Sequence, residues 1–192
     1  MSPTESAPPA PDGQSDAALV RAAAGGEDKA FDRLMSRHAP RIVRFLTQQT
    51  GDAAAAEDIA QDSFVALYRN LDRFDPDKPF ETWLFTIARN KMRDHFRRRT
   101  VLRWLGEETD FDRFEGGEAD PETIAGDRGE LRRLSDDLAR LPEGLRTPLL
   151  LASVEGMPLA EIGTVMGLTE KAVEVRIYRA RKVLRSRRPG EA

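Results

Sequence analysis

The chain has 192 residues, 40% of them hydrophobic and 33% charged, a composition ordinary for a soluble globular protein with one medium domain or two small ones. It contains no cysteine, which excludes disulfides, thiolate metal sites and cysteine nucleophiles and fits a reducing compartment. No run approaches the ~18 apolar residues of a membrane span, and the first residues lack the regions of a signal peptide, so we expect a cytoplasmic protein without membrane insertion.

The formal net charge of -3 conceals an uneven distribution along the chain. Residues 89–103 hold seven Arg or Lys against one Asp, and residues 171–188 hold eight against one Glu. Between them, residues 104–130 hold ten acidic residues against two Arg. Because nucleic-acid binding depends on local clusters of charge, the two basic blocks favour a nucleic-acid partner despite the negative total.

Residues 1–15 are rich in Pro, Ser and Ala and predict a disordered tail. From Leu19 to Leu184 the apolar residues recur at helical spacing, which predicts an all-α fold. A short helix is expected after Asp16, ending at Gly25 and Gly26. The next helix carries Phe31, Leu34, Met35, Ile42, Phe45 and Leu46; Asp52 is then the expected N-cap of a helix that carries Ile59, Phe64, Leu67 and Leu71.

The stretch FETWLFTIARNKMRDHFRRR, residues 80–99, predicts a helix with two different faces. On a helical wheel one arc holds Leu84, Ile87, Ala88, Met92 and Phe96, and the opposite side holds Arg89, Arg93 and Arg97, with Trp83 near Asn90. Arginines in a row suit a phosphate backbone, and an aromatic beside them suits an unpaired base. The alternative is that Trp83 packs at the edge of the core and the arginines form a solvated face.

An acidic, glycine-rich linker is predicted over residues 104–130, because this segment cannot bury much apolar surface, and helices are expected to resume at Leu131. Farther on, Gly163 and Gly167 are followed by Thr169, which is the expected N-cap of the next helix. The helix after them carries a narrow apolar stripe of Val173, Ile177, Ala180 and Leu184. This spacing predicts a helix-turn-helix, in which the small Gly163 allows close helix approach and Gly167 makes the turn.

Three motifs, AEDIAQDSF, FETWLFTIARNKMRDHFRRR and EIGTVMGLTEKAVEVRIYRARK, together resemble the extracytoplasmic-function sigma factors of bacterial RNA polymerase in order and spacing. The resemblance extends over residues 16–188. It implies a sigma-two domain over 16–103 and a sigma-four domain over 131–188, joined by the linker. The implied function is that of an alternative sigma factor, which binds core polymerase and directs promoter recognition, duplex opening and transcription initiation. It implies no enzyme activity, cofactor or metal.

The resemblance also implies roles for individual residues. Docking on the clamp helices of the polymerase largest subunit is assigned to Asp58, Gln61, Asp62 and Phe64. Minus-ten DNA contacts and melting are assigned to Trp83, Arg89, Asn90, Arg93 and Arg97, and minus-thirty-five contacts to Lys171, Glu174, Val175, Arg176, Tyr178 and Arg179. Further implied partners are the polymerase flap and an anti-sigma factor. For AEDIAQDSF, composition alone favours the alternative of a capped amphipathic helix that exposes acids.

Glu174 and Val175 depart from the pattern of many relatives, which carry a basic and a small polar residue there. By direct-readout chemistry Glu174 accepts a hydrogen bond from a cytosine amino group and Val175 packs on a thymine methyl, so we predict a C and a T among the contacted bases. Alternatively, Glu174 pairs with Tyr178 or Arg181 on the same helix face. The acidic linker either shields the basic helices of the free protein or acts as a soluble tether.

The main rival function is a stand-alone helix-turn-helix transcription regulator. Residues 28–103, however, show neither an α/β receiver pattern nor a ligand-pocket domain, and they carry a basic aromatic helix of their own. The chain also contains no P-loop, dinucleotide fingerprint, HExxH motif or nucleophile elbow. His38 and His95 lie far apart in sequence and are expected to be packing or surface residues.

Overall fold

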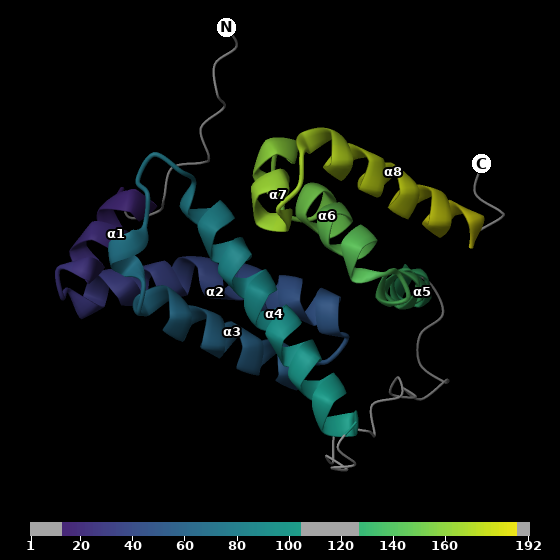
Figure 1. The fold of residues 1–192 in the computed structure, drawn as a ribbon, viewed down its shortest axis with the longest axis horizontal. Helices are drawn as coiled ribbons and strands as arrows, with labels where there is room; N and C mark the ends of the chain where they lie inside the picture. The colour runs from purple at the N-terminus through teal and green to yellow at the C-terminus, as the bar shows by residue number, and fades with distance from the viewer. Residues whose placement is uncertain (1–12, 105–126, 188–192) are drawn as a thin grey trace, which may run out of the picture.

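The computed structural model describes residues 13–104 and 127–187, and the regular elements in those ranges are all helical, as the sequence predicted (Figure 1). In chain order the elements are α1 (Asp16–Ala24), α2 (Asp28–Thr50), α3 (Ala53–Tyr68), the 3-10 helix η1 (Leu71–Arg73), α4 (Phe80–Trp104), α5 (Asp127–Ala139), α6 (Glu143–Ser153), α7 (Leu159–Met166) and α8 (Glu170–Ser186).

Local signals set most helix ends. The Ser15 side chain accepts a hydrogen bond from the backbone N–H of Ala18 at 3.3 Å and caps α1. Asp52 caps α3 in the predicted way, since its carboxylate accepts from the N–H of Ala55 at 3.1 Å. The sequence placed Leu71 on the helix that Asp52 caps, and this prediction is wrong. Helix α3 ends at Tyr68, and Leu71 lies in η1.

Helices α1 to α4 form the first helical group, whose core lies between α2, α3 and α4 (Figure 1). Leu84, Ala88 and Met92 are buried on the arc of α4 that the helical wheel predicted. The ring of Phe85 packs edge-on against Phe45 of α2, with centroids 5.2 Å apart. This packing fixes α4 to its own group along the apolar side and leaves the other side for further contacts.

Helices α5 to α8 form the second helical group. Here α5 begins at Asp127 rather than at Leu131, so the end of the predicted linker is helical. The sequence Asp-Arg-Gly-Glu at 127–130 explains the correction, because Arg and Glu are good helix formers and an acidic residue near a helix N-terminus interacts favourably with the helix dipole. The predicted linker residues 105–126 lie outside the described residues.

The helix-turn-helix prediction is confirmed in the second helical group. Gly167 ends α7 in the left-handed conformation, with φ of 66°, and the Thr169 side chain accepts from the N–H of Ala172 at 3.3 Å. Val173, Ile177 and Ala180 are buried. They form the apolar stripe that attaches α8 to α6 and α7.

The two helical groups pack against each other. Helix α4 contacts α7, while α2 contacts α5 and α6 (Figure 1). Buried apolar residues of both groups belong to one continuous cluster. The sequence, with its expected tether between two separate bodies, did not predict this contact.

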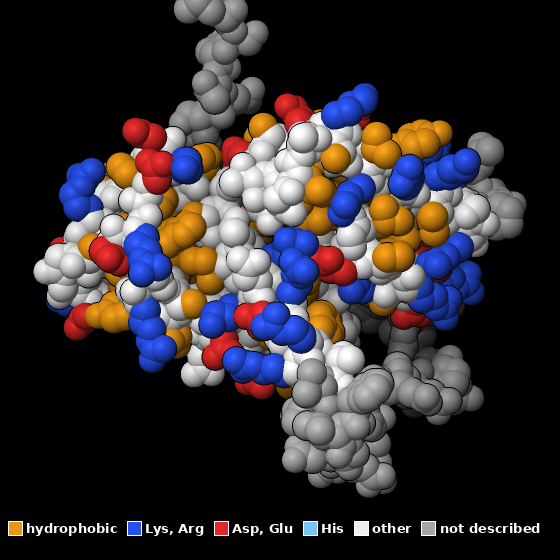
Figure 2. Space-filling view, in the orientation of Figure 1, with side chains coloured by type: hydrophobic (Ala, Val, Ile, Leu, Met, Phe, Trp, Pro, Cys, Tyr) orange, Lys and Arg blue, Asp and Glu red, His pale blue; other side chains and the backbone are white. Residues whose placement is uncertain are grey.

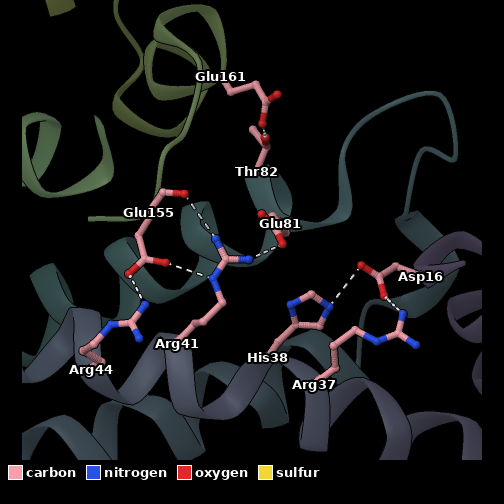
Figure 3. A network of polar contacts seen from close by, with 9 residues as sticks. All are labelled: Asp16, Arg37, His38, Arg41, Arg44, Glu81, Thr82, Glu155 and Glu161. Atoms are coloured by element: carbon pink, nitrogen blue, oxygen red, sulfur yellow. Dashed lines mark hydrogen bonds and ion pairs between the residues drawn. The ribbon is translucent and has the colours of Figure 1, made fainter. Parts of the chain in front are cut away.

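A polar cluster ties α1 to α2. His38 is buried, and its Nε2 lies 3.0 Å from a carboxylate oxygen of Asp16, which also pairs with Arg37 (Figure 3). Burial alone raises the pKa of Asp16, but the hydrogen bonds and charges of His38 and Arg37 outweigh it and bring the pKa below its ordinary value of 3.8. The expectation that His38 is a packing residue is therefore consistent with its position, with a carboxylate as its polar partner.

Within the described ranges, none of the helices is both long and apolar enough to cross a membrane.

The Asp16 cluster predicts a specific pH dependence of stability. Because the pKa of Asp16 is lower in the folded chain than in the unfolded one, its ionised form contributes stability above about pH 4, and this contribution disappears as the pH falls through the lowered folded-state value. Asp16→Asn is expected to reduce the free energy of unfolding by about 2 kcal/mol at pH 7 and by progressively less below pH 4. Urea unfolding followed by circular dichroism measures both.

Asp32→Asn provides the matched control, since Asp32 is exposed on α2. Its stability is expected to stay within about 0.5 kcal/mol of the original chain. Equal stability of the Asp16→Asn and Asp32→Asn variants at pH 7 contradicts the anchoring role of Asp16.

Candidate nucleic-acid interface

The predicted arginine row on α4 is divided in the structure. Arg93 and Arg97 are exposed, as is Asn90, and the Nη2 of Arg97 lies 3.0 Å from a carboxylate oxygen of Asp94. Arg89, in contrast, is only 8% exposed, because the second helical group covers it. Its Nε donates to Glu143 at 2.9 Å and its Nη1 to the carbonyl of Val165 at 3.4 Å.

Trp83 is half-buried at the start of α4. Its ring lies 5.3 Å from that of Phe74 at an interplanar angle of 33°, and 6.1 Å from that of Phe80. The indole therefore belongs to an aromatic cluster at the point where the loop after η1 enters α4. Part of the surface of Trp83 is packed, as the alternative of packing at the core edge describes, and part remains accessible.

The outward face of α8 is exposed. The predicted contact residues on it are Lys171, Glu174, Val175, Tyr178 and Arg179. Tyr178 has 62% of its surface exposed, which is high for an aromatic residue. Arg176 is half-buried, and its Nη1 donates to the carbonyl of Gly144 at 3.5 Å. Figure 2 shows basic side chains over α8, and also over the lower half of α4, where acidic ones are interspersed.

Glu174 has a partner that neither alternative named. Its carboxylate lies 2.6 Å from the Nζ of Lys171, one turn earlier on α8. Because both side chains are exposed, this ion pair contributes little to stability and is easily replaced by contacts to a ligand.

Two of the four predicted polymerase-docking residues, Gln61 and Phe64, line an apolar groove between α2 and α3, and Asp58 and Asp62 lie on α3 outside its lining. Asp58, Gln61 and Asp62 are exposed, whereas Phe64 is buried and forms part of the groove wall. The groove has a volume of about 560 Å³; its apolar lining consists of Phe31, Met35, Ala39, Val43, Ala60, Phe64, Val65 and Tyr68, with Glu57, Gln61 and Arg69 at its polar positions. Val65 and Tyr68 are among the large hydrophobic residues that remain exposed in the described chain.

Several polar residues that sequence reasoning missed lie where the two helical groups meet (Figure 3). Arg41 of α2 pairs with Glu81 of α4 and with Glu155, which lies between α6 and α7, and Arg44 pairs with Glu155 as well. The Thr82 hydroxyl donates to Glu161 at 2.5 Å. Composition and periodicity carry no signal for these contacts, because each partner resembles an ordinary polar residue of its own segment.

The surroundings shift the pKa values of two arginines at this boundary in opposite directions. Partial burial lowers the pKa of Arg41, but hydrogen bonds and charges from Glu155 and Glu81 outweigh it and raise the pKa. For Arg146 burial dominates over the charge of Glu143 and lowers the pKa. The Arg146 Nε donates to the side-chain oxygen of Gln49 at 3.2 Å, a neutral partner across the boundary.

Among the residues that the structure describes, none of the groups of acidic and histidine side chains has an arrangement that could hold a metal ion. The groups that this interface presents are arginines, aromatic rings and exposed polar side chains. These groups suit phosphate binding and base stacking.

Comparison with known proteins gives two family matches. The family model of Sigma-70 region 2 matches residues 34–101, and that of Sigma-70 region 4 matches residues 131–184. The first match covers most of α2, α3 and α4, and the second covers most of α5 to α8.

Curated relatives align over most of the chain. The RNA polymerase sigma factor CnrH of Cupriavidus metallidurans is 40% identical over 176 residues, which cover 88% of this chain and 92% of CnrH. The RNA polymerase sigma-H factor of Pseudomonas aeruginosa is 33% identical over 180 residues, covering 89% of this chain and 92% of the relative. The ECF RNA polymerase sigma factor SigE of Mycolicibacterium smegmatis is 33% identical and covers 81% of this chain and 60% of the relative.

Solved structures share the fold. The structure of CnrH in complex with the cytosolic domain of CnrY has a TM-score of 0.70 and 33% identity, covering 93% of this chain and 100% of that chain. The sigma factor RpoE of Bartonella quintana, in complex with the anti-sigma factor NepR, has a TM-score of 0.68 and 22% identity, covering 82% of this chain and 96% of that one.

The close approach of α7 to α8 yields a prediction for Gly163. A Cβ at this position would lie 2.8 Å from the carbonyl oxygen of Leu168, a backbone atom that cannot move aside cheaply. Gly163→Ala is therefore expected to destabilise the chain by about 1–3 kcal/mol and to disturb the presentation of α8. Thermal unfolding measures the first effect, and binding of a labelled duplex measures the second.

Thr164→Ala is the control, because Thr164 is the exposed neighbour of Gly163 on α7. Its effect is expected to stay near 0.5 kcal/mol or below. An unchanged unfolding temperature for Gly163→Ala contradicts the close packing of the turn.

Proposed function

The chain belongs to the extracytoplasmic-function sigma factors of bacterial RNA polymerase, and we propose that it binds the core enzyme, directs it to promoters and takes part in opening the duplex. Sigma factors act as initiation factors without enzyme activity of their own. The observation that carries the proposal is the presence of two separate basic helices, α4 and α8, each attached through an apolar side to its own helical group.

Helix α8 is proposed to read the minus-thirty-five element. Its buried stripe leaves Lys171, Glu174, Val175, Tyr178 and Arg179 on the outward face, where a helix enters the major groove in helix-turn-helix proteins. The polar and apolar groups on this face can contact base edges, and the basic ones can contact phosphates. Arg176 is proposed to contact the backbone after exchanging its partner, the carbonyl of Gly144.

Helix α4 is proposed to bind the minus-ten element. The exposed Asn90, Arg93 and Arg97 supply donors for the phosphate backbone, and the accessible part of Trp83 supplies a surface on which an unpaired base can stack. Stacking of this kind offsets part of the few kcal/mol that unstacking a base step costs. Arg89 belongs to the same row, and its participation requires displacement of the second helical group.

The groove between α2 and α3 is proposed as the docking surface for the clamp helices of the polymerase. A hydrophobic groove with polar groups at its edge is a common receptor for amphipathic helices. Asp58, Gln61 and Asp62 are exposed on the helix that forms one wall, and Phe64 provides apolar contact. The second helical group is proposed to contact the polymerase flap, as the family resemblance implies.

An anti-sigma factor is the third proposed partner. The relative CnrH was solved with the cytosolic domain of CnrY, and its fold matches this chain over nearly its whole length. We propose that a comparable protein holds this chain inactive in the cytoplasm. The domain division at 16–103 and 131–188, with an acidic tether between, belongs to the same proposal.

A stand-alone helix-turn-helix regulator explains less of the chain. Such a function accounts for α7 and α8 but gives no role to the family match over residues 34–101, nor to the basic aromatic face of α4. Dependence on core polymerase separates the two functions experimentally.

The polymerase dependence is testable by run-off transcription from a library of genomic fragments. Transcripts are expected only when the chain and core polymerase are both present. Val65→Asp places a charge in the groove, at a valine that is 43% exposed, and is expected to reduce transcription at least tenfold because a carboxylate must be desolvated on docking. Ala54→Asp, at an exposed position of the same helix outside the groove, is the control.

Transcripts made equally well by the Val65→Asp and Ala54→Asp variants contradict the groove as a docking surface. An absence of any transcript with the original chain contradicts the proposed function itself.

The base preference of α8 is testable by selecting bound sites from random DNA with the core enzyme present. Glu174→Ala is expected to lose the preference for cytosine at one position of the minus-thirty-five element, with discrimination reduced by about 1–3 kcal/mol. The remaining positions are expected to keep their preferences. An unchanged set of selected sites removes Glu174 from base recognition and leaves it as the surface partner of Lys171.

A further inference from the structure

A buried carboxylate connects the two helical groups. The side chain of Glu155 is only 1% exposed, and its two oxygens accept from two arginines of α2 (Figure 3). The distances are 2.9 Å to the Nε of Arg41 and 3.0 Å to the Nη2 of Arg44. The backbone carbonyl of Glu155 accepts a further bond from Arg41 at 3.4 Å.

Two more glutamates of the second helical group make similar contacts. Glu143 binds Arg89, and Glu161 accepts from the hydroxyl of Thr82. Three carboxylates of one group thus satisfy donors on α2 and α4 of the other. In these contacts the first helical group presents the donors, and the second presents the anions.

The chemistry of these donors does not require a carboxylate. A guanidinium binds the oxygens of a phosphodiester through the same planar, charge-assisted hydrogen bonds that it makes with a carboxylate. Arg41 and Arg44 lie three residues apart on α2 and therefore share one helix face. Arg89 continues the row of Arg93 and Arg97 on α4, whose exposed members are already suited to phosphates.

We propose that Arg41 and Arg44 are a phosphate-binding site for the promoter strand, and that Glu155 occupies this site in the free chain and keeps the two helical groups closed. The inference rests on the proposed function and extends it to α2. Promoter phosphates and the second helical group then compete for the same arginines, so the minus-ten surface is complete only after the groups separate.

Closure affects the two DNA surfaces unequally. The outward face of α8 stays exposed in the closed chain, whereas Arg89 is covered. The free chain is therefore expected to retain a usable minus-thirty-five surface while its minus-ten surface is incomplete.

The variant Glu155→Gln tests the closure. It keeps the shape of the side chain but removes the charge that both arginines bind. Glu27→Gln is the matched control, because Glu27 is exposed and makes no side-chain cap hydrogen bond. Since the chain has no cysteine, Ser36→Cys on α2 and Ser186→Cys on α8 allow specific attachment of a donor and an acceptor dye.

Energy transfer between the dyes is expected to fall for Glu155→Gln and to stay unchanged for Glu27→Gln. Helicity by circular dichroism must remain at the original value, which establishes that the groups separate without unfolding. Arg44→Gln removes part of the same ion-pair network from the other side and is expected to lower energy transfer as well. Unchanged energy transfer in both Glu155→Gln and Arg44→Gln overturns the closure.

DNA binding tests the site itself. The probe is a fluorescein-labelled 30-base-pair duplex with six unpaired bases at its centre, used without polymerase at one fixed salt concentration. Glu155→Gln is expected to bind this probe on the order of tenfold more tightly than the original chain, because a larger fraction of the chain is competent to bind. The double variant Glu155→Gln, Arg44→Gln is expected to lose most of that gain and to show a salt slope smaller by about 0.7–0.9.

Two outcomes overturn the phosphate site. In the first, the double variant binds the probe as tightly as Glu155→Gln alone. In the second, Glu155→Gln gains affinity for polyglutamate but not for the probe, which identifies the arginines as a site for an acidic polypeptide. Run-off transcription with core polymerase is measured separately on the original chain, so a failure of the proposed function is distinguishable from a failure of this inference.

Discussion

The position of Glu155 depends on one constraint, which is that a carboxylate removed from water must find compensating charges. Its side chain is almost completely buried, and the strong penalty for an unpaired buried charge means that Arg41 and Arg44 must accompany it. Apolar packing between α4 and α7 brings the two helical groups together, but apolar contact is not directional. The ion pairs are directional and fix the position of one group on the other. In this position Arg89 is covered, whereas the outward face of α8 is not.

Helix α4 serves both groups at once. Leu84, Ala88 and Met92 hold it to α2 and α3, while Thr82 and Arg89 on other faces contact the second helical group. A helix whose polar face is fully satisfied by water gains no stability when another helix packs on that face. Here the polar face carries donors that water, glutamates or phosphates can satisfy, and in the proposed opening phosphates replace the glutamates.

Sequence reasoning recovered what is local. Periodicity gave the helices and the buried arc of α4, and side-chain capping gave the ends at Asp52 and Thr169, because these features depend on residues a few positions apart. The contacts of Glu155 with Arg41 and Arg44 were missed, since they join residues more than a hundred positions apart that look like ordinary surface charges. The sequence placed Arg89 on the correct face of α4, but only the structure reveals that the second helical group covers this residue.

The packing of Gly163 against the turn before α8 separates the orientation of α8 from its chemistry. The approach of α7 to the turn before α8 is set by backbone atoms, with the carbonyl of Leu168 where a side chain would begin, and not by any residue on the outward face. Residues such as Glu174 and Val175 can therefore be exchanged during evolution without changing the angle at which the helix is presented. Under the minus-thirty-five role proposed for α8, a few surface substitutions on an unaltered frame suffice to change the promoter specificity.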